Sequence, residues 1–214
     1  MKSFNEIFDE TKIIAILRGV PEDRLTDVLD AIYDGGIRLA EITYDRTGRV
    51  SDEKTAENIK KAVKHTEGRM YIGAGTVLTE KQVRLTKESG GRFIISPDTN
   101  PDIITATKNA GLYSLPGAMT ISEIVTAHNA GADFVKLFPA DTFGPSYVKA
   151  VLAPLKGIKL VAVSGVTPEN IPDYLKAGCV GFGIGSAIVN AALVKENKLD
   201  TIRENAKQYA EACR

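Results

Sequence analysis

The chain has 214 residues and balances 27 basic against 27 acidic side chains, which argues against nucleic acid or an anionic membrane surface as its main partner. No apolar stretch approaches the roughly 20 residues that a membrane helix needs, and the polar segment from Met1 to Glu10 does not read as a signal peptide. Only Cys179 and Cys213 are present, without metal or redox spacing, so we expect a cytoplasmic protein in a reducing compartment.

Short apolar segments with strand composition alternate with segments of helical composition along the whole chain. In chain order, the expected strands span residues 12–19, 39–45, 71–78, 92–98, 112–118, 133–140, 159–166 and 180–186. Glycines that can close a helix precede five of them, in Asp34-Gly35-Gly36, Ser89-Gly90-Gly91, Asn109-Ala110-Gly111, Asn129-Ala130-Gly131 and Lys176-Ala177-Gly178. Helix starts are expected at Pro21-Glu22-Asp23, Thr79-Glu80, Thr120-Ile121-Ser122-Glu123 and Thr167-Pro168-Glu169.

A strand followed by a helix, repeated along the chain, predicts parallel strands with right-handed crossovers. Eight such units in 214 residues predict an α/β fold, a (β/α)8 TIM barrel. No linker or charge block divides the chain, so one domain is expected over residues 1–214. An open doubly wound sheet is the alternative, and the lack of a dinucleotide-binding loop after the first strand disfavours it.

In such a barrel, functional groups gather where the strands end, and side chains alternate between the two faces of a strand. The faces of interest carry Ile14, Ile16 and Arg18 in the first strand, Leu39, Glu41 and Thr43 in the second, and Phe134, Lys136 and Phe138 in the sixth. If these faces point inward, Arg18, Glu41 and Lys136 converge in the upper barrel.

Lys136 lies inside an apolar run where an unpaired ammonium group would be costly. An amine with a pKa near 10.4 is neutral in about one molecule of 2,500 at pH 7. Burial and a nearby cation such as Arg18 can lower that pKa to about 7 or 8. The neutral amine can then form an imine with a ketone, with Glu41 as proton shuttle, and so assist carbon–carbon cleavage. A surface lysine, and Glu41 as a structural ion-pair partner, are the alternatives.

Two glycine-bearing segments follow the seventh and eighth strands, Val163-Ser164-Gly165-Val166-Thr167-Pro168 and Gly183-Ile184-Gly185-Ser186. Loops at these places in barrels frequently bind phosphate through backbone N–H groups. Ser164, Gly165, Gly185 and Ser186 are therefore candidate phosphate-binding residues; the alternative is that the glycines only close tight turns.

The two histidines, His65 and His128, lie within or near the ends of expected helices, where solvated surface residues are typical. A His-rich zinc site is therefore not expected. We expect neither a metal nor another cofactor, although a divalent ion held by carboxylates remains open.

The chain resembles the pyruvate-dependent aldolases that split 2-keto-3-deoxy-6-phosphogluconate and 4-hydroxy-2-oxoglutarate, from about Ile13 to Val189. The resemblance rests on Ile16-Leu17-Arg18-Gly19, Ala40-Glu41-Ile42-Thr43, Gly73-Ala74-Gly75-Thr76-Val77-Leu78, Phe93-Ile94-Ile95-Ser96-Pro97, Leu115-Pro116-Gly117, Phe134-Val135-Lys136-Leu137-Phe138-Pro139-Ala140 and Gly183-Ile184-Gly185-Ser186.

This resemblance implies a (β/α)8 barrel, usually a homotrimer, that needs no metal. It implies Lys136 as the Schiff-base lysine, Glu41 as the general acid/base and Arg18 beside them. It also implies Thr76 as a ligand of the pyruvate carboxylate, Pro97 as a pocket wall, and Gly165 and Ser186 as ligands of the phosphate.

Three positions depart from the family's pattern. The family usually reads Glu-x-Thr-x-Arg-Thr, with an arginine that grips the carboxylate, whereas this chain inserts one residue in Glu41-Ile42-Thr43-Tyr44-Asp45-Arg46-Thr47. Strand alternation then puts Asp45 on the face of Glu41 and Arg46, the candidate carboxylate ligand, on the other, unless a bulge intervenes. Val163 and Ser164 replace the family's usual Thr-Gly, which bears on the substrate.

From these residues we expect a class I aldolase that cleaves 2-keto-3-deoxy-6-phosphogluconate, or a related 2-keto-4-hydroxy acid, to pyruvate and an aldehyde such as glyceraldehyde 3-phosphate or glyoxylate. The expected partner is this small keto acid. Two alternatives remain, a phosphosugar isomerase or epimerase barrel, and a non-catalytic barrel that binds a keto acid or a sugar phosphate.

Overall fold

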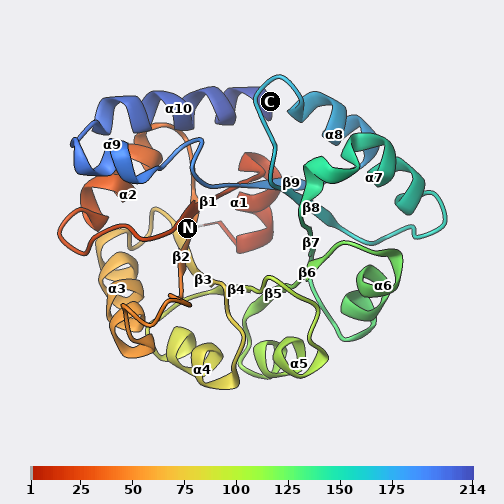
Figure 1. The fold of residues 1–214 in the computed structure, drawn as a ribbon, viewed down its shortest axis with the longest axis horizontal. Coiled ribbons are helices and arrows are strands. Elements are labelled where there is room, and N and C mark those ends of the chain that lie inside the picture. Colours follow the sequence, from red (N-terminus) through yellow and green to blue (C-terminus); the bar gives the residue numbers. More distant parts are fainter. Residues whose placement is uncertain (1) are drawn as a thin grey trace.

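The computed structural model describes residues 2–214 as a ring of strands surrounded by helices (Figure 1). The strands are β1 Ile13–Leu17, β2 Leu39–Thr43, β3 Tyr71–Gly75, β4 Phe93–Ile95, β5 Tyr113–Leu115, β6 Gly117–Ala118, β7 Val135–Leu137, β8 Leu160–Val163 and β9 Gly181–Ile184. The helices are α1 Phe4–Thr11, α2 Leu25–Asp34, α3 Asp52–His65, α4 Glu80–Glu88, α5 Pro101–Asn109, α6 Ile121–Asn129, α7 Gly144–Leu152, α8 Ile171–Ala177, α9 Ala191–Lys195 and α10 Leu199–Ala212, with a 3-10 turn at Ala140–Thr142.

The strands form one parallel sheet in the order β5-β4-β3-β2-β1-β9-β8-β7-β6. Its two outer strands, β5 and β6, follow one another in the chain with only Pro116 between them, so the chain itself closes the ring. The (β/α)8 barrel is confirmed, and the open doubly wound sheet is excluded.

The fifth expected strand differs from the prediction, because it is split into β5 and β6. Pro116 has no N–H group with which to continue the ladder, so the regular pairing stops there. The Pro116 carbonyl oxygen still accepts a hydrogen bond from the Lys136 backbone N–H at 2.9 Å, which joins the two halves of the ring beside the candidate lysine.

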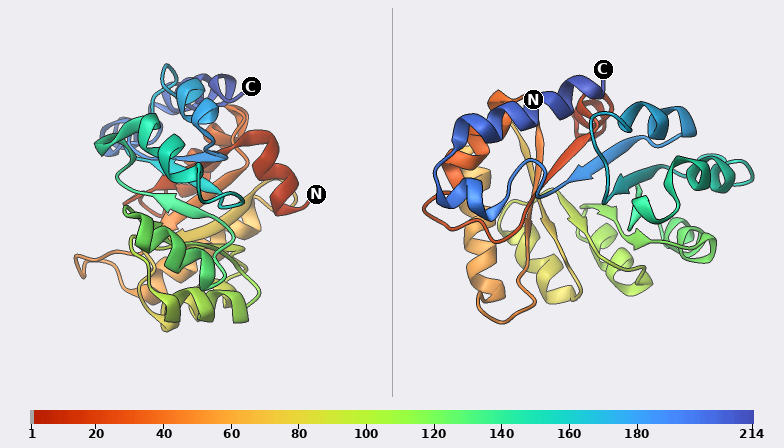
Figure 2. Two further views of the ribbon diagram at one scale, coloured as in Figure 1. Left: turned by 90° about the vertical axis from the view of Figure 1, so that its right-hand side faces the viewer. Right: turned by 45° about the horizontal axis from the view of Figure 1, so that its top comes forward.

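Helix α1 closes the end of the barrel at which the strands begin. The Phe4 ring stacks on Tyr113 with ring centroids 4.2 Å apart, and the Phe8 ring meets Phe134 edge-on at 4.7 Å. Figure 2 shows α1 and the loop that follows β2 at opposite ends of the molecule. Aromatic side chains therefore fill the interior at the end where the strands begin, and the buried polar groups lie toward the end where the strands finish.

The alternation predicted for the strands is confirmed. Ile14 and Ile16 of β1, Leu39 of β2, and Phe134 just before β7 belong to one buried cluster inside the barrel. Glu41 and Lys136 lie two residues farther along the same faces and are also buried.

The expected helix ends are confirmed, because one glycine in each of the five signals has a positive φ: Gly36, Gly90, Gly111, Gly131 and Gly178. The N-caps Thr79 and Thr120 are also confirmed. Two expected helix starts are wrong, since α2 begins at Leu25 and α8 at Ile171. Before α8, the Asn170 side chain accepts from the Thr167 backbone N–H and donates to the Gly165 carbonyl oxygen, which fixes a turn instead of a helical start.

Candidate active site

Lys136 occupies the middle of β7, between Gly117 of β6 and Val161 of β8. Its side chain is 8% exposed, and its Nζ lies 4.7 Å from the ring centroid of Phe138. The strand alternation that buries Phe134 at the base of the barrel turns Lys136 inward as well. The amine is therefore held in largely apolar surroundings.

Glu41 reaches the interior from β2, on the other side of the ring. It is 2% exposed, and its Oε2 has no hydrogen-bond partner among residues 2–214. Gly75 of β3 makes room for it, because a Cβ at that position would overlap the Glu41 carboxyl group. A carboxyl group that is buried without donors keeps its proton more readily than one in water.

The two groups have pKa shifts in opposite directions. Burial raises the pKa of Glu41 to about 7, although the charges of Lys136 and Arg18 act against this shift. Burial also lowers the pKa of the Lys136 amine, helped by the Arg18 charge and opposed by Glu41. Glu41 and Lys136 are close enough for each charge to act on the other, yet they form no ion pair within 4 Å in the described chain. An amine with a lowered pKa thus lies near a carboxyl group that titrates around neutral pH.

Arg18 follows β1 directly and is exposed at the rim. It lines three cavities, and the two larger ones hold the other candidate rim residues. The walls of these cavities include neither Glu41 nor Lys136, which lie deeper in the barrel. The charge of Arg18 acts on the buried pair, and Arg18 also lines both of the larger cavities.

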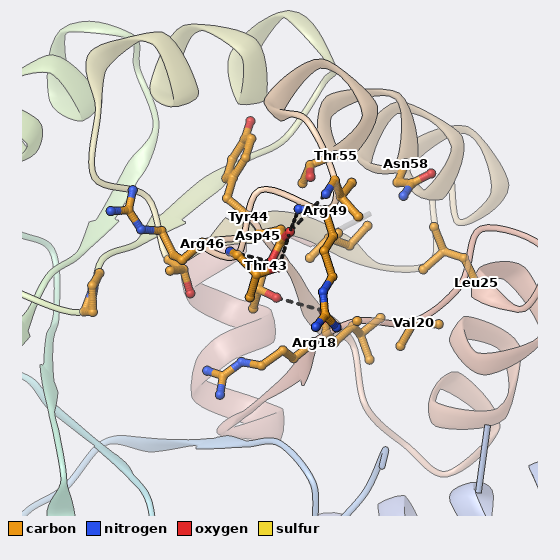
Figure 3. Close-up of a pocket in the computed structure, with 17 residues that line it drawn as sticks. Arg18, Val20, Leu25, Thr43, Tyr44, Asp45, Arg46, Arg49, Thr55 and Asn58 are labelled. Atoms are coloured by element: carbon orange, nitrogen blue, oxygen red, sulfur yellow. Dashed lines mark hydrogen bonds between the residues drawn. The ribbon is translucent and has the colours of Figure 1, made fainter. Parts of the chain in front are cut away.

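Cavity 1 has a volume of about 540 Å³ and brings together Arg18, Thr76, Pro97 and Arg46 (Figure 3). Thr76 follows β3 with φ 59°, a left-handed conformation that is a true outlier for a β-branched residue. Such strain persists where surrounding structure enforces it, most often in binding sites.

The residue inserted after Thr43 does not place Asp45 and Arg46 on opposite faces of a strand, as strand alternation had suggested. Strand β2 ends at Thr43, so neither Asp45 nor Arg46 follows the strand's alternation. Tyr44 turns outward, where its hydroxyl group donates to the Gln82 carbonyl oxygen at 3.2 Å. Asp45 holds its own loop together, and Arg46 is exposed on the wall of cavity 1.

Cavity 2 has a volume of about 400 Å³ and collects the four candidate phosphate-binding residues, Ser164, Gly165, Gly185 and Ser186. Ser164 and Gly165 are successive residues with φ of 84° and 65°. A Cβ on Gly165 would overlap Asp141, so only glycine fits there. The structure thus brings the segments after β8 and β9 to one cavity. Ser164, in the first of them, has a strained backbone conformation.

Two parts of the cavity walls were missed by sequence reasoning. Arg49 lines cavity 1 from the loop after β2, where no periodic pattern points to it. Asn190 and Ala191 line cavity 2 at the start of α9. Asn190 was recognisable as a helix cap, since its side chain accepts from the Leu193 backbone N–H at 3.0 Å.

The remaining titratable candidates lie elsewhere. His65 contacts Asp30 at 2.9 Å on the outer side of the barrel, His128 is exposed, and both cysteines are free and buried. Within residues 2–214, no group of three or more His, Cys, Asp or Glu side chains is arranged to hold a metal ion. In the same part of the chain, no helix has the length and apolarity to cross a membrane.

Comparisons with known proteins agree over nearly the whole chain. The KDPG and KHG aldolase family model matches residues 4–205. A 2-dehydro-3-deoxy-6-phosphogalactonate aldolase of Escherichia coli is 35% identical over 201 residues, which cover 94% of this chain and 95% of that protein. A 2-dehydro-3-deoxy-phosphogluconate aldolase of Haemophilus influenzae is 30% identical over 194 residues, which cover 90% of this chain and 88% of that protein. A solved structure described as native KDPGal has a TM-score of 0.84 at 34% identity and covers 94% of this chain and 93% of its own.

Proposed function

The chain belongs to the KDPG and KHG aldolase family and is an aldolase, and from this premise we propose that it cleaves a 6-phosphorylated 2-keto-3-deoxy sugar acid to pyruvate and glyceraldehyde 3-phosphate through a Schiff base on Lys136. The names of the relatives support this substrate class, because one acts on a phosphogalactonate and another on a phosphogluconate derivative. The single observation that carries the mechanism is the buried pair of Lys136 and Glu41 with opposite pKa shifts.

Lys136 is the nucleophile in this proposal. The lowered pKa of its amine increases the neutral fraction that can attack the C2 carbonyl carbon of the keto acid. The carbinolamine gains a proton on its oxygen and loses water, which leaves an imine between Nζ and C2. The protonated imine is the electron sink for the next step.

Glu41 moves the protons. With a pKa of about 7 it is present in both forms near neutral pH, so it can donate a proton to the departing water and then accept one from the C4 hydroxyl group. When that hydroxyl loses its proton, C4 becomes the aldehyde carbon and the C3–C4 bond breaks. The electron pair of this bond enters the imine as an enamine. Protonation at C3 and hydrolysis then release pyruvate and free Lys136.

The two cavities receive the two ends of the substrate. Arg18, Thr76 and Pro97, with Arg46 on the same wall, supply a positive site for the carboxylate in cavity 1. Ser164, Gly165, Gly185 and Ser186 supply backbone groups and two hydroxyl groups for the phosphate in cavity 2. Arg18 lies between the two cavities and thus near the middle of the bound chain.

The borohydride experiment tests the Schiff base. Reduction in the presence of pyruvate should leave a stable adduct on Lys136, located by mass spectrometry of peptides. Lys159 is the matched control, since its Nζ lies 5.1 Å from the Phe134 ring but its side chain belongs to the exposed surface. Labelling that survives Lys136→Ala, or an unlabelled Lys136 in the active protein, would exclude the mechanism.

The same experiment separates the two alternatives. An isomerase or epimerase needs a base at the substrate carbon and no covalent lysine, so it would leave no adduct. A non-catalytic barrel would gain melting temperature with a keto acid but would release no pyruvate from any 2-keto-4-hydroxy acid. Pyruvate release, measured with lactate dehydrogenase over phosphorylated and unphosphorylated acids including 4-hydroxy-2-oxoglutarate, also identifies the substrate.

We further propose a homotrimer in the cytoplasm that needs no metal, since the imine itself withdraws the electrons of the breaking bond. Exposed apolar side chains support self-association: Ile121 and Phe143 are 49% and 51% exposed at the starts of α6 and α7. Light scattering of the purified protein tests the trimer, and a monomer at micromolar concentration would exclude it. Full turnover after exhaustive chelation is expected.

A further inference from the structure

The Lys136 amine lies behind the walls of the two larger cavities, although it is the group that a keto acid has to reach. Neither Lys136 nor Glu41 belongs to the wall of cavity 1 or of cavity 2. Lys136 is only 8% exposed, so little of its surface meets solvent. A side chain at the rim therefore has to move before the C2 carbonyl carbon of the substrate can come within bonding distance of Nζ.

Phe138 occupies the place between the amine and cavity 2. It follows β7 directly and lies two residues beyond Lys136, on the same face of the chain. Its ring centroid is 4.7 Å from the Lys136 Nζ. The same side chain forms part of the wall of cavity 2, together with Arg18 and Ser164. One ring thus contacts the amine and also borders the space from which a substrate arrives.

The Phe138 side chain has room to rotate while its backbone stays fixed. It is 40% exposed, whereas Phe134 on the same face is 2% exposed. Its backbone N–H donates to the Ala118 carbonyl oxygen at 3.0 Å, which anchors the residue to β6. Cavity 2 has a volume of about 400 Å³, and Gly183 and Gly185 line it without side chains. Exposed side chains change rotamer within picoseconds to nanoseconds, so rotation of this ring needs no movement of the barrel.

The contact between the ring and the nitrogen should strengthen during the reaction. The face of an aromatic ring attracts a cation, most strongly where water is excluded. Burial lowers the pKa of the Lys136 amine, so the attraction is lost in the fraction of molecules with a neutral amine, and there the ring mainly excludes water. The protonated imine has a positive charge on the same nitrogen. The ring therefore favours the intermediate over the neutral amine.

We propose that Phe138 is a positioning residue that covers the Lys136 amine in the free protein, rotates away to admit the keto acid from cavity 2, and then closes against the protonated imine. This inference rests on the proposed Schiff base at Lys136. Closure also keeps bulk water from the imine, which water would otherwise hydrolyse before the C3–C4 bond breaks. Phe138 thus acts through Lys136 and takes no part in proton transfer.

The first test measures access to the Lys136 amine. Trinitrobenzenesulfonate labels neutral amines, and mass spectrometry of peptides gives the labelling rate at Lys136 over a range of pH. The midpoint of that curve reports the pKa of the amine, and its plateau reports access. A cover that is open for about 10% of the time slows labelling in proportion, so Phe138→Leu should raise the plateau about tenfold. Lys159 has an exposed side chain and should be labelled equally in every variant.

The second test measures turnover, on which the same substitution should act in the opposite direction. Leucine has no aromatic face for the protonated imine, so kcat for cleavage should fall about 5- to 30-fold. Phe138→Tyr keeps the ring and should remain near wild type in both measurements. Phe138→Met is a second variant without a ring, in case Phe138→Leu does not fold. Phe143→Leu is the matched control, because Phe143 is an exposed aromatic residue outside cavities 1 and 2, and it should change neither quantity.

A merely structural role for Phe138 would lower turnover without uncovering the amine. An unchanged labelling plateau in Phe138→Leu would therefore overturn the proposal, as would a kcat that does not fall, or a Phe138→Tyr protein that behaves like Phe138→Leu. If pyruvate and borohydride leave no adduct on wild-type Lys136, the Schiff-base proposal fails. The labelling plateau then still decides whether Phe138 covers the amine.

Discussion

Glu41 and Asp45 lie four residues apart in the sequence and show what the two regions of the site do to the same functional group. Glu41 is in the barrel interior, where burial raises its pKa to about 7. Asp45 is in the rim loop, where donors from Thr47, Val50 and Arg49 hold its pKa at about 2. Desolvation without donors favours the neutral acid, and several N–H donors favour the anion. The interior therefore supports proton transfer, and the rim supports fixed geometry.

The barrel interior and the rim also differ in backbone strain. Inside the barrel the side chains follow strand alternation, and space for Glu41 comes from Gly75. At the rim, Thr76 and Ser164 have positive φ values that a side chain disfavours. Variants in the interior should therefore act mainly on the rate of reaction, and variants at the rim on binding and stability.

The largest effect is expected for Lys136→Ala, which tests whether the reaction depends on the interior alone. Turnover should vanish, because no other amine lies at the same place, while the fold remains, since a buried amine is replaced by a small apolar group. Pyruvate release and circular dichroism measure the two quantities, and Lys159→Ala serves as control. Retained turnover in Lys136→Ala would show that the buried lysine does not carry out the reaction.

Glu41→Gln should slow turnover by about 10² to 10⁴, the usual contribution of a general acid/base. The amide has nearly the shape of the acid but cannot exchange the proton. The wild-type pH–rate profile should also have a limb near the Glu41 pKa of about 7, and the variant should lack it. An unchanged profile in Glu41→Gln would assign the proton transfer to another group.

Stability should depend on pH through the same carboxyl group. Its pKa rises from the ordinary value of 4.5 to about 7 in the fold, so the folded state keeps a proton that the unfolded state releases. The stabilising contribution is complete below pH 4.5 and is lost as the pH rises through 7, by about 3 kcal/mol. Urea unfolding at pH 5 and pH 8 should therefore show Glu41→Gln gaining stability relative to wild type at the higher pH. A constant difference would contradict this.

Gly75→Ala should lower both the stability and the reaction rate, because the added Cβ displaces the Glu41 carboxyl group. We expect a loss of about 1–3 kcal/mol in the free energy of unfolding, the usual result of overfilling a core, together with a lower kcat. Gly185→Ala is a control for stability, since its Cβ would lie 3.6 Å from the nearest atom, in Ile16. Full activity in Gly75→Ala would show that the position of Glu41 is not critical.

The smallest effect is expected at the rim, for Ser164→Gly. Glycine accepts φ 84° without the penalty that serine pays, so the free energy of unfolding should rise by about 1 kcal/mol. Ser164→Ala keeps the penalty and should leave stability nearly unchanged. The KM for a phosphorylated substrate, compared between the two variants, then separates the backbone from the hydroxyl group. Equal stability of both variants would contradict strain at Ser164.

Much of the interior could be predicted from the sequence. The faces of β1, β2 and β7 follow from alternation alone, and they put Glu41 and Lys136 among Ile14, Leu39 and Phe134 as expected. The five helix-ending glycines were equally readable, because the left-handed conformation selects glycine. The two wrong helix starts have one cause, since a cap signal such as Thr167-Pro168-Glu169 cannot show that Asn170 will tie the same residues into a turn.

The sequence by itself determined the barrel and the inward faces of its strands, because periodicity 2 and short apolar segments are local properties of the chain. The tertiary structure alone decided that Gly75 clears space for Glu41 and that Asp45 binds its own loop. These depend on where separate segments meet and on which backbone donors a loop offers. Alternation stops predicting direction at the last residue of a strand, and the candidate binding residues lie just beyond it.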